Sequence, residues 1–237
     1  MWRVLSSEFL KIRKKMIWFL IFLGPIGVIG LQAFNFGLRY DYLTKIYAED
    51  LWGGLIGNVA MLMIPTLFIG LAIISSMTAG IEHQTNVWKQ TLALPITRMQ
   101  IFIGKFLLNA LLLLFSATLL IPGTIILGVL LGFSVDQFPY SAMLEWAYLP
   151  YLAILPFMAL QVWLSVTMHN QALPLTIGIV GTVVSMFATR FEDWVPYKWV
   201  YLLNAADNPY YSAVAGILLG IAVLLAGTLH FIRKDVL

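Results

Sequence analysis

The sequence predicts an all-α, polytopic membrane protein with six transmembrane helices, an N-terminal amphipathic interfacial helix and a short cytoplasmic helix. Of its 237 residues, 61% are hydrophobic and 11% are charged, whereas soluble chains carry about 25% charged residues. Five long intervals contain no Asp, Glu, Lys or Arg: 16–38, 51–81, 106–135, 146–189 and 208–232. Because one crossing needs about 20 apolar residues, each interval can span a bilayer. The composition excludes a nucleic-acid binder, a disordered regulator and most soluble enzymes.

Residues 1–15 are expected to form an amphipathic helix along the membrane surface. Trp2, Leu5, Phe9 and Ile12 recur at helical spacing and fall on one face, while most of the basic residues in this stretch fall elsewhere. Such a helix lies in the membrane interface with its basic groups near anionic lipid heads. Simple juxtamembrane anchoring is the alternative, and contact with a partner protein could accompany either arrangement.

The number of spans follows from the interval 146–189, which is about twice as long as one crossing requires. His169-Asn170-Gln171, followed by Pro174, marks a break within it. The predicted spans are 16–35, 54–80, 106–131, 149–168, 173–189 and 211–232.

Six spans place both termini on one side, and that side holds ten of the 14 Lys and Arg residues. Basic residues concentrate in the cytoplasmic loops of membrane proteins. We therefore expect a multi-pass protein of the cell membrane with both termini in the cytoplasm.

The stretch 82–105 is the longest loop expected on the cytoplasmic side. Thr85 or Asn86 could cap a short helix that ends before Pro95, and Thr97 could cap the next span. A bare connector would be much shorter, so the length and mixed polarity of this loop indicate a docking surface.

The order of residues in this loop resembles the coupling-helix region of ABC-2 type exporter permeases. The shared pattern is a glutamate, polar residues, a short helix, a leucine, a proline and an arginine, and a Gly-Lys pair at the next span. The matching positions are Glu82, Leu92, Pro95, Arg98, Gly104 and Lys105. The family's commoner form has Gly-Thr after the glutamate, where this chain has Gln84-Thr85. The opening Ser-Glu-Phe-Leu-Lys-Ile-Arg-Lys-Lys is similar to the branch of bacteriocin-immunity and bacitracin-resistance permeases.

This resemblance implies the permease subunit of an ABC exporter, paired with a second permease that is either an identical or a sister chain. The coupling helix would sit in a groove of a separate ABC ATPase, which would hold ATP and Mg, with no cofactor on this chain. The expected docking residues are Glu82, His83, Thr85, Asn86, Trp88, Lys89, Pro95 and Arg98. Glu82, Lys89 and Arg98 are expected to make charge-assisted contacts with either the ATPase or the first helix. The implied cargo is an amphipathic peptide antibiotic or bacteriocin, whose export or removal gives immunity or resistance.

The resemblance also implies an element between spans five and six that dips into the outer leaflet. Residues 190–210 fit this feature because they carry the amphipathic aromatics Trp194, Tyr197, Trp199 and Tyr201. Such side chains settle at the headgroup level, so an ordinary aromatic belt is the alternative.

Other chemistry finds little support in the sequence. No Gly-x-x-x-x-Gly-Lys-Ser/Thr loop occurs, so active transport needs energy from a partner. The predicted span interiors carry no Asp or Glu, which disfavours an intramembrane protease and a proton-coupled transporter. The three histidines do not form a metal-binding pattern, and we expect neither a metal nor a catalytic site. A non-transporting scaffold or sensor subunit remains the alternative function, because it would show the same spans and charge bias.

Overall fold

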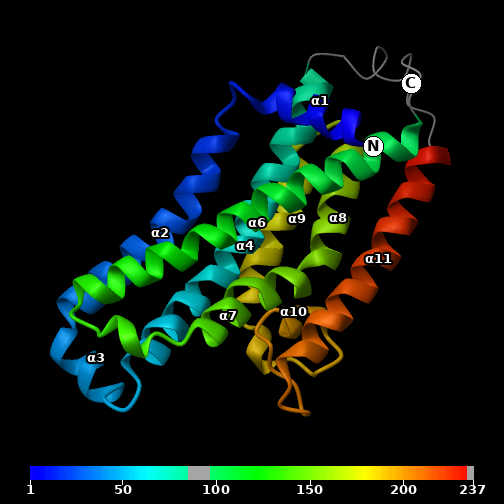
Figure 1. Cartoon of the computed structure of the whole chain (residues 1–237). Helices are drawn as coiled ribbons and strands as arrows, with labels where there is room; N and C mark the ends of the chain where they lie inside the picture. The colour runs from blue at the N-terminus through cyan, green and yellow to red at the C-terminus, as the bar shows by residue number, and fades with distance from the viewer. Residues whose placement is uncertain (85–96, 234–237) are drawn as a thin grey trace.

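The computed structural model describes residues 1–84 and 97–233, and within these ranges the chain is built of helices without strands (Figure 1). Four of the helices are long and apolar enough to cross a membrane. They are α2 (Ile17–Leu38), α4 (Leu51–Gln84), α6 (Arg98–Leu130) and α11 (Pro209–Arg233). These helices coincide with the first, second, third and sixth predicted spans, so the charge-free intervals located them correctly.

The fourth predicted span, 149–168, is a bent pair of helices. α7 (Tyr140–Ala153) and α8 (Leu155–Thr167) meet at an angle of 43°. Pro156 lies in the first turn of α8, where it has no N–H to donate to the preceding turn and therefore favours a bend. Counted together, the pair is a fifth candidate span.

The fifth predicted span, 173–189, is shorter in the structure. α9 (Ala172–Ser185) has 14 residues and is about 21 Å long, whereas the hydrocarbon core is about 30 Å thick. The described chain thus has four candidate spans, or five with the bent pair, and a sixth crossing stays a prediction. The predicted break before α9 is confirmed, and the Ala172 N–H donates to Asn170 Oδ1 at 2.9 Å.

The short elements lie at one end of the helix array (Figure 1). They are α3 (Tyr40–Ile46), η1 (Val135–Gln137), η2 (Ala188–Arg190) and α10 (Pro196–Trp199). α1 (Trp2–Ile12), the last turn of α4, the first turn of α6 and the last turn of α11 lie at the opposite end. Arg98 Nη1 donates to the Ile232 carbonyl at 3.1 Å and ties α6 to α11 there. The first and last helices of the described chain, α1 and α11, therefore reach the same end of the helix array.

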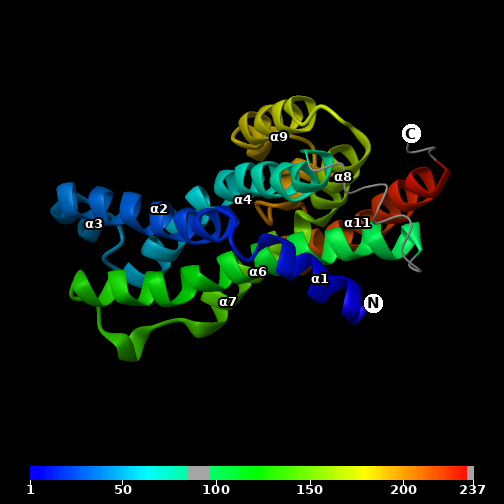
Figure 2. The ribbon, with the colours of Figure 1, turned by 90° about the horizontal axis from the view of Figure 1, so that it is seen from above.

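α4 is the central helix. It contacts α2, α6, α7, α8 and α9, and Figure 2 shows it between α9 and α6. In its most apolar stretch 61% of the residues are buried, against 28–33% for α2, α6 and α11. Displacement of α4 would consequently disturb most of the other helices.

A proline interrupts the hydrogen bonding of α2. Pro25 has no N–H, so the Ile21 carbonyl one turn earlier loses its usual helical donor. Ser116 on α6 replaces that donor, since its Oγ donates to the Ile21 oxygen at 3.0 Å. This bond fixes α2 against α6 at the position where α2 is weakest.

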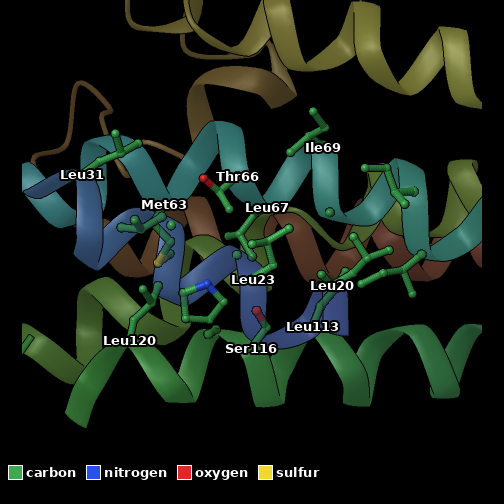
Figure 3. A pocket seen from close by; sticks show the side chains of 18 residues that line it. Leu20, Leu23, Leu31, Met63, Thr66, Leu67, Ile69, Leu113, Ser116 and Leu120 are labelled. Atoms are coloured by element: carbon green, nitrogen blue, oxygen red, sulfur yellow. The ribbon is translucent and has the colours of Figure 1, made fainter. Parts of the chain in front are cut away.

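An apolar cavity of about 310 Å³ lies beside this bond, between α2, α4 and α6 (Figure 3). Its two hydroxyl-bearing residues, Ser116 and Thr66, both donate to backbone carbonyls, Thr66 to Leu62 at 2.7 Å. Its walls are therefore mainly hydrocarbon, and both of their hydroxyl groups already donate a hydrogen bond. The cavity lies near the middle of all three helices.

We expect Ser116→Ala to lower the free energy of unfolding by about 1–3 kcal/mol, because it leaves the Ile21 carbonyl without a donor. In a Pro25→Ala background, residue 25 supplies the N–H itself, so the same substitution should be nearly neutral. Thr66→Ala is the matched control, since Leu62 keeps its own helical N–H donor. Denaturant unfolding in detergent of the unchanged chain, the two single variants and the double variant measures how far the effect of Ser116→Ala depends on Pro25. An equal loss of unfolding free energy in both backgrounds would show that Ser116 does not replace the donor missing at Pro25.

Candidate functional site

Four charged side chains meet where α1, α4 and α6 converge, and we call them the charge cluster. They are Glu8 and Lys11 of α1, Glu82 of α4 and Lys105 of α6. Lys11 Nζ lies 2.5 Å from Glu8 Oε1 and 2.5 Å from Glu82 Oε1. Lys105 Nζ lies 3.1 Å from Glu8 Oε2 and 2.9 Å from Glu82 Oε2. Each carboxylate thus bridges both ammonium groups in an alternating ring with no net charge.

The ring is buried. The side chains of Glu82 and Lys105 are each 1% exposed, that of Glu8 is 4% exposed, and only that of Lys11 reaches solvent, at 28%. A charge removed from water is tolerated when it is paired and hydrogen-bonded. Because the partners come from three helices, pairing can be complete only while α1, α4 and α6 keep this arrangement.

Asn109 extends the polar contact between α4 and α6. Its Nδ2 donates to the Lys105 carbonyl at 2.8 Å and to Thr78 Oγ1 at 3.2 Å. Its Oδ1 accepts from Ser75 Oγ at 3.2 Å. These bonds hold the two long helices together one turn beyond the charge cluster.

The two members of the charge cluster on α1, Glu8 and Lys11, remain ionised over a wide pH range. Burial alone would raise the pKa of Glu8, but the ammonium groups of Lys105 and Lys11 outweigh burial and hold this pKa below its ordinary value of 4.5. Burial would lower the pKa of Lys11, but Glu8 and Glu82 raise it above its ordinary 10.5. Both pKa shifts stabilise the docked α1 at pH values between the two ordinary pKa values, 4.5 and 10.5. The contribution of Glu8 is lost as pH falls through its lowered pKa, and that of Lys11 is lost as pH rises through its raised pKa.

The predicted N-terminal helix forms, but its apolar face is divided. Leu5 and Ile12 are buried in the protein, Phe9 is half-buried and Trp2 is 78% exposed. α1 contacts α6, so part of the face expected to meet lipid packs on the protein instead.

The structure shortens the predicted loop 82–105 at both ends. α4 continues to Gln84, and α6 begins at Arg98. Thr97 caps α6 as expected: its Oγ1 accepts from the Gln100 N–H at 3.2 Å, and its own N–H donates to Gln100 Oε1 at 3.1 Å. Lys105 is consequently two turns inside a helix rather than at the end of a loop.

Gly104, which precedes Lys105, lets α1 approach α6 closely. A Cβ atom at this position would lie 2.8 Å from Val4 Cγ1, a distance that would push the two helices apart. The Gly-Lys pair of the sequence pattern therefore has two distinct tasks: close packing by the first residue and charge pairing by the second.

Both flanks of the segment 85–96 are bonded to other helices. Glu82 pairs with Lys11 of α1, which is one of the two contacts expected for it. His83 Nε2 donates to the Ser165 carbonyl of α8 at 3.2 Å, and Arg98 binds the end of α11. The flanks are thus held by α1, α8 and α11.

The remaining predicted docking residues, Thr85, Asn86, Trp88, Lys89 and Pro95, lie outside the described residues, and their roles stay predictions. Glu8 and Lys11 were missed as site residues because an interfacial helix explained them. Glu82 was expected to contact either the ATPase or the first helix, but the sequence did not indicate which residues of that helix would be its partners.

At the opposite end, residues 190–210 hold the predicted outer aromatics. Trp194 is 77% exposed, as expected for a headgroup contact. Tyr197 instead packs inward, with its ring 5.5 Å from that of Phe68 and 4.4 Å from that of Phe157. This segment is therefore attached to α4 and α8.

Asp193 organises the same segment. A hydrogen bond from Lys198 at 2.7 Å, then one from the Ala205 N–H at 2.8 Å, lower the pKa of its carboxyl. Its carbonyl accepts from Trp199 Nε1 at 2.6 Å, and Tyr201 is half-buried nearby in sequence. Of the four predicted aromatics, only Trp194 is largely exposed.

We expect Lys105→Met to undock α1, because one ammonium group would then face two buried carboxylates. In a Val4→Cys background, where the new thiol is the chain's only cysteine, thiol labelling should speed up by about tenfold or more, since breaking a buried pair costs about 3–5 kcal/mol. Adding Glu82→Gln restores the charge balance and should slow labelling again. Equal labelling rates in all three backgrounds would contradict a structural role for the cluster.

A family model described as ABC-2 family transporter protein matches residues 4–185, which include most of α1, the whole charge cluster and the helices through α9. No curated protein and no solved structure shows a significant match. The match covers most of the chain and agrees with several apolar helices that can cross a membrane. The chain therefore belongs to the ABC-2 family of transporter proteins, the multi-pass membrane components that work with an ABC ATPase.

Proposed function

We propose that the chain is the permease of an exporter that removes an amphipathic peptide antibiotic or bacteriocin from the membrane, driven by an ATPase that docks on the loop after α4. The observation that supports this proposal most directly is the bonding of both flanks of that loop. Glu82 joins α1, His83 joins α8 and Arg98 joins α11. A force applied to the loop can therefore be transmitted to the other helices through α1, α8 and α11.

In this mechanism the charge cluster makes α1, α4 and α6 move together. Separating its members would leave a buried charge unpaired, at a cost of several kcal/mol, so displacement of the loop moves the three helices as one body. α4 then passes the movement to α2, α8 and α9, which it contacts directly. Trp88 would provide the large contact in the ATPase groove, with Lys89 as its charged neighbour.

The walls of the cavity between α2, α4 and α6 support an amphipathic cargo. They are hydrocarbon apart from two hydroxyls that are already bonded, so they suit an apolar segment better than a charged solute. The permease would work as a dimer, with an identical or a sister chain, and two ATPase subunits.

The orientation that we propose places the α1 end in the cytoplasm of a plasma-membrane protein. Most Lys and Arg residues of the chain belong to that end, in keeping with the positive-inside rule. The ATPase, a cytoplasmic subunit, would then meet the loop on the correct side.

We expect Trp88→Ala with Lys89→Ala to abolish copurification of the ATPase while leaving membrane insertion intact, because the two changes remove the main contact surface and charge of the loop. The matched control is Trp194→Ala with Lys45→Ala, which removes the same residue types from exposed positions at the opposite end. Pulldown of the tagged permease, followed by mass spectrometry, measures both variants.

Normal transport and full ATPase recovery with the Trp88 and Lys89 variant would show that the docking role is wrong. Recovery of no ATPase even with the unchanged chain would favour the scaffold or sensor alternative. Loss of ATPase in the control variant as well would point to general misfolding, and would remove the support for a docking surface in this loop.

A further inference from the structure

We propose that the groove between α1, the start of α2 and α6 binds one phospholipid with an anionic headgroup. The groove is lined by Trp2, Phe9, Trp18 and Leu111, with Arg13 at its rim. Its lining residues come from α1, the start of α2 and α6, and Figure 2 shows α1 crossing α6 at the edge of the helix array. The site is separate from the cavity between α2, α4 and α6 and does not depend on the identity of the cargo.

The position of the groove suits a lipid chain. Leu111 is 41% exposed and lies six residues beyond Lys105 on α6, about 9 Å deeper along the helix axis. Trp18 belongs to the first turn of α2, at the level where tryptophan settles in the membrane interface. The groove therefore extends from the level of the charge cluster toward the bilayer core, the path that an acyl chain follows from its headgroup.

The basic residue that lines the groove, Arg13, has no ion-pair partner among the described residues. Arg13, Lys14 and Lys15 are exposed, and no carboxylate of residues 1–84 or 97–233 forms an ion pair with them. The two described acids at this end, Glu8 and Glu82, are occupied by Lys11 and Lys105 in the charge cluster. The cluster is neutral, so neither it nor any other described acid balances the positive charge of Arg13 in the groove and of the two lysines that follow it in the chain.

An anionic phospholipid satisfies both parts of the site. Its phosphate complements the guanidinium group of Arg13, and its acyl chain covers the aromatic and aliphatic walls. A soluble anion would leave these walls exposed, and a zwitterionic lipid would leave the positive charge at the rim uncompensated. The combination of walls and rim thus selects one class of lipid.

Native mass spectrometry of the full chain, titrated with phosphatidylglycerol or phosphatidylcholine of equal chain length, tests the site. We expect a clear preference for phosphatidylglycerol and about fivefold weaker binding with Arg13→Gln, since a basic residue near an anionic surface contributes about 1 kcal/mol. Arg3→Gln is the matched control, because it removes the same charge from α1 outside the groove. Leu111→Trp narrows the groove without changing any charge and should also weaken binding.

Equal affinity for the two lipids would overturn the proposal. Equal weakening by Arg13→Gln and Arg3→Gln would replace the site by diffuse attraction to the membrane surface. Undiminished binding with Leu111→Trp would show that the acyl chain lies elsewhere, and would likewise overturn it. Weakening by the two groove variants, with the Arg3 control unchanged, supports a discrete lipid site.

Discussion

The burial of two carboxylates and two ammonium groups at the junction of α1, α4 and α6 constrains the rest of this structure. Each of the four charges has partners of opposite sign on both sides, and three of them are almost fully removed from water. Such a ring is stable only when complete, because a missing partner leaves a buried charge that neither water nor protein compensates. The three helices must therefore keep their relative positions at this end.

This constraint connects the surface of the protein to its interior. α1 lies outside the array and carries half of the ring, whereas α4 is the most buried of the long helices. Bonds from His83 to α8 and from Arg98 to α11 continue the same connection on both sides of residues 85–96. At the other end the ring of Tyr197 stacks on Phe68 of α4 and packs against Phe157 of α8. A movement of α4 thus reaches both ends of the molecule.

Much of the fold follows from composition alone. Long uncharged intervals located α2, α4, α6 and α11, and Thr97 was recognised as a cap because its position before an apolar run is typical of one. The bend between α7 and α8 and the short α9 were not predicted, because the residues on both sides of the break at 169–171 are predominantly apolar and such a run does not by itself fix where a helix bends or ends. The charge cluster required knowledge of tertiary contacts. Lys105 was placed at the edge of a span, and only the early start of α6 at Arg98 shows that it is interior.

The claim that α1, α4 and α6 move as one body is tested most directly by a distance measurement across α1 and α6. The chain has no native cysteine, so spin labels can be placed at the exposed positions Ser7 and Met99 in the transporter reconstituted with its ATPase. Double electron–electron resonance should give one narrow distance distribution, unchanged between the nucleotide-free and the ATP-trapped states. A shift or broadening of that distribution on ATP trapping would contradict the account.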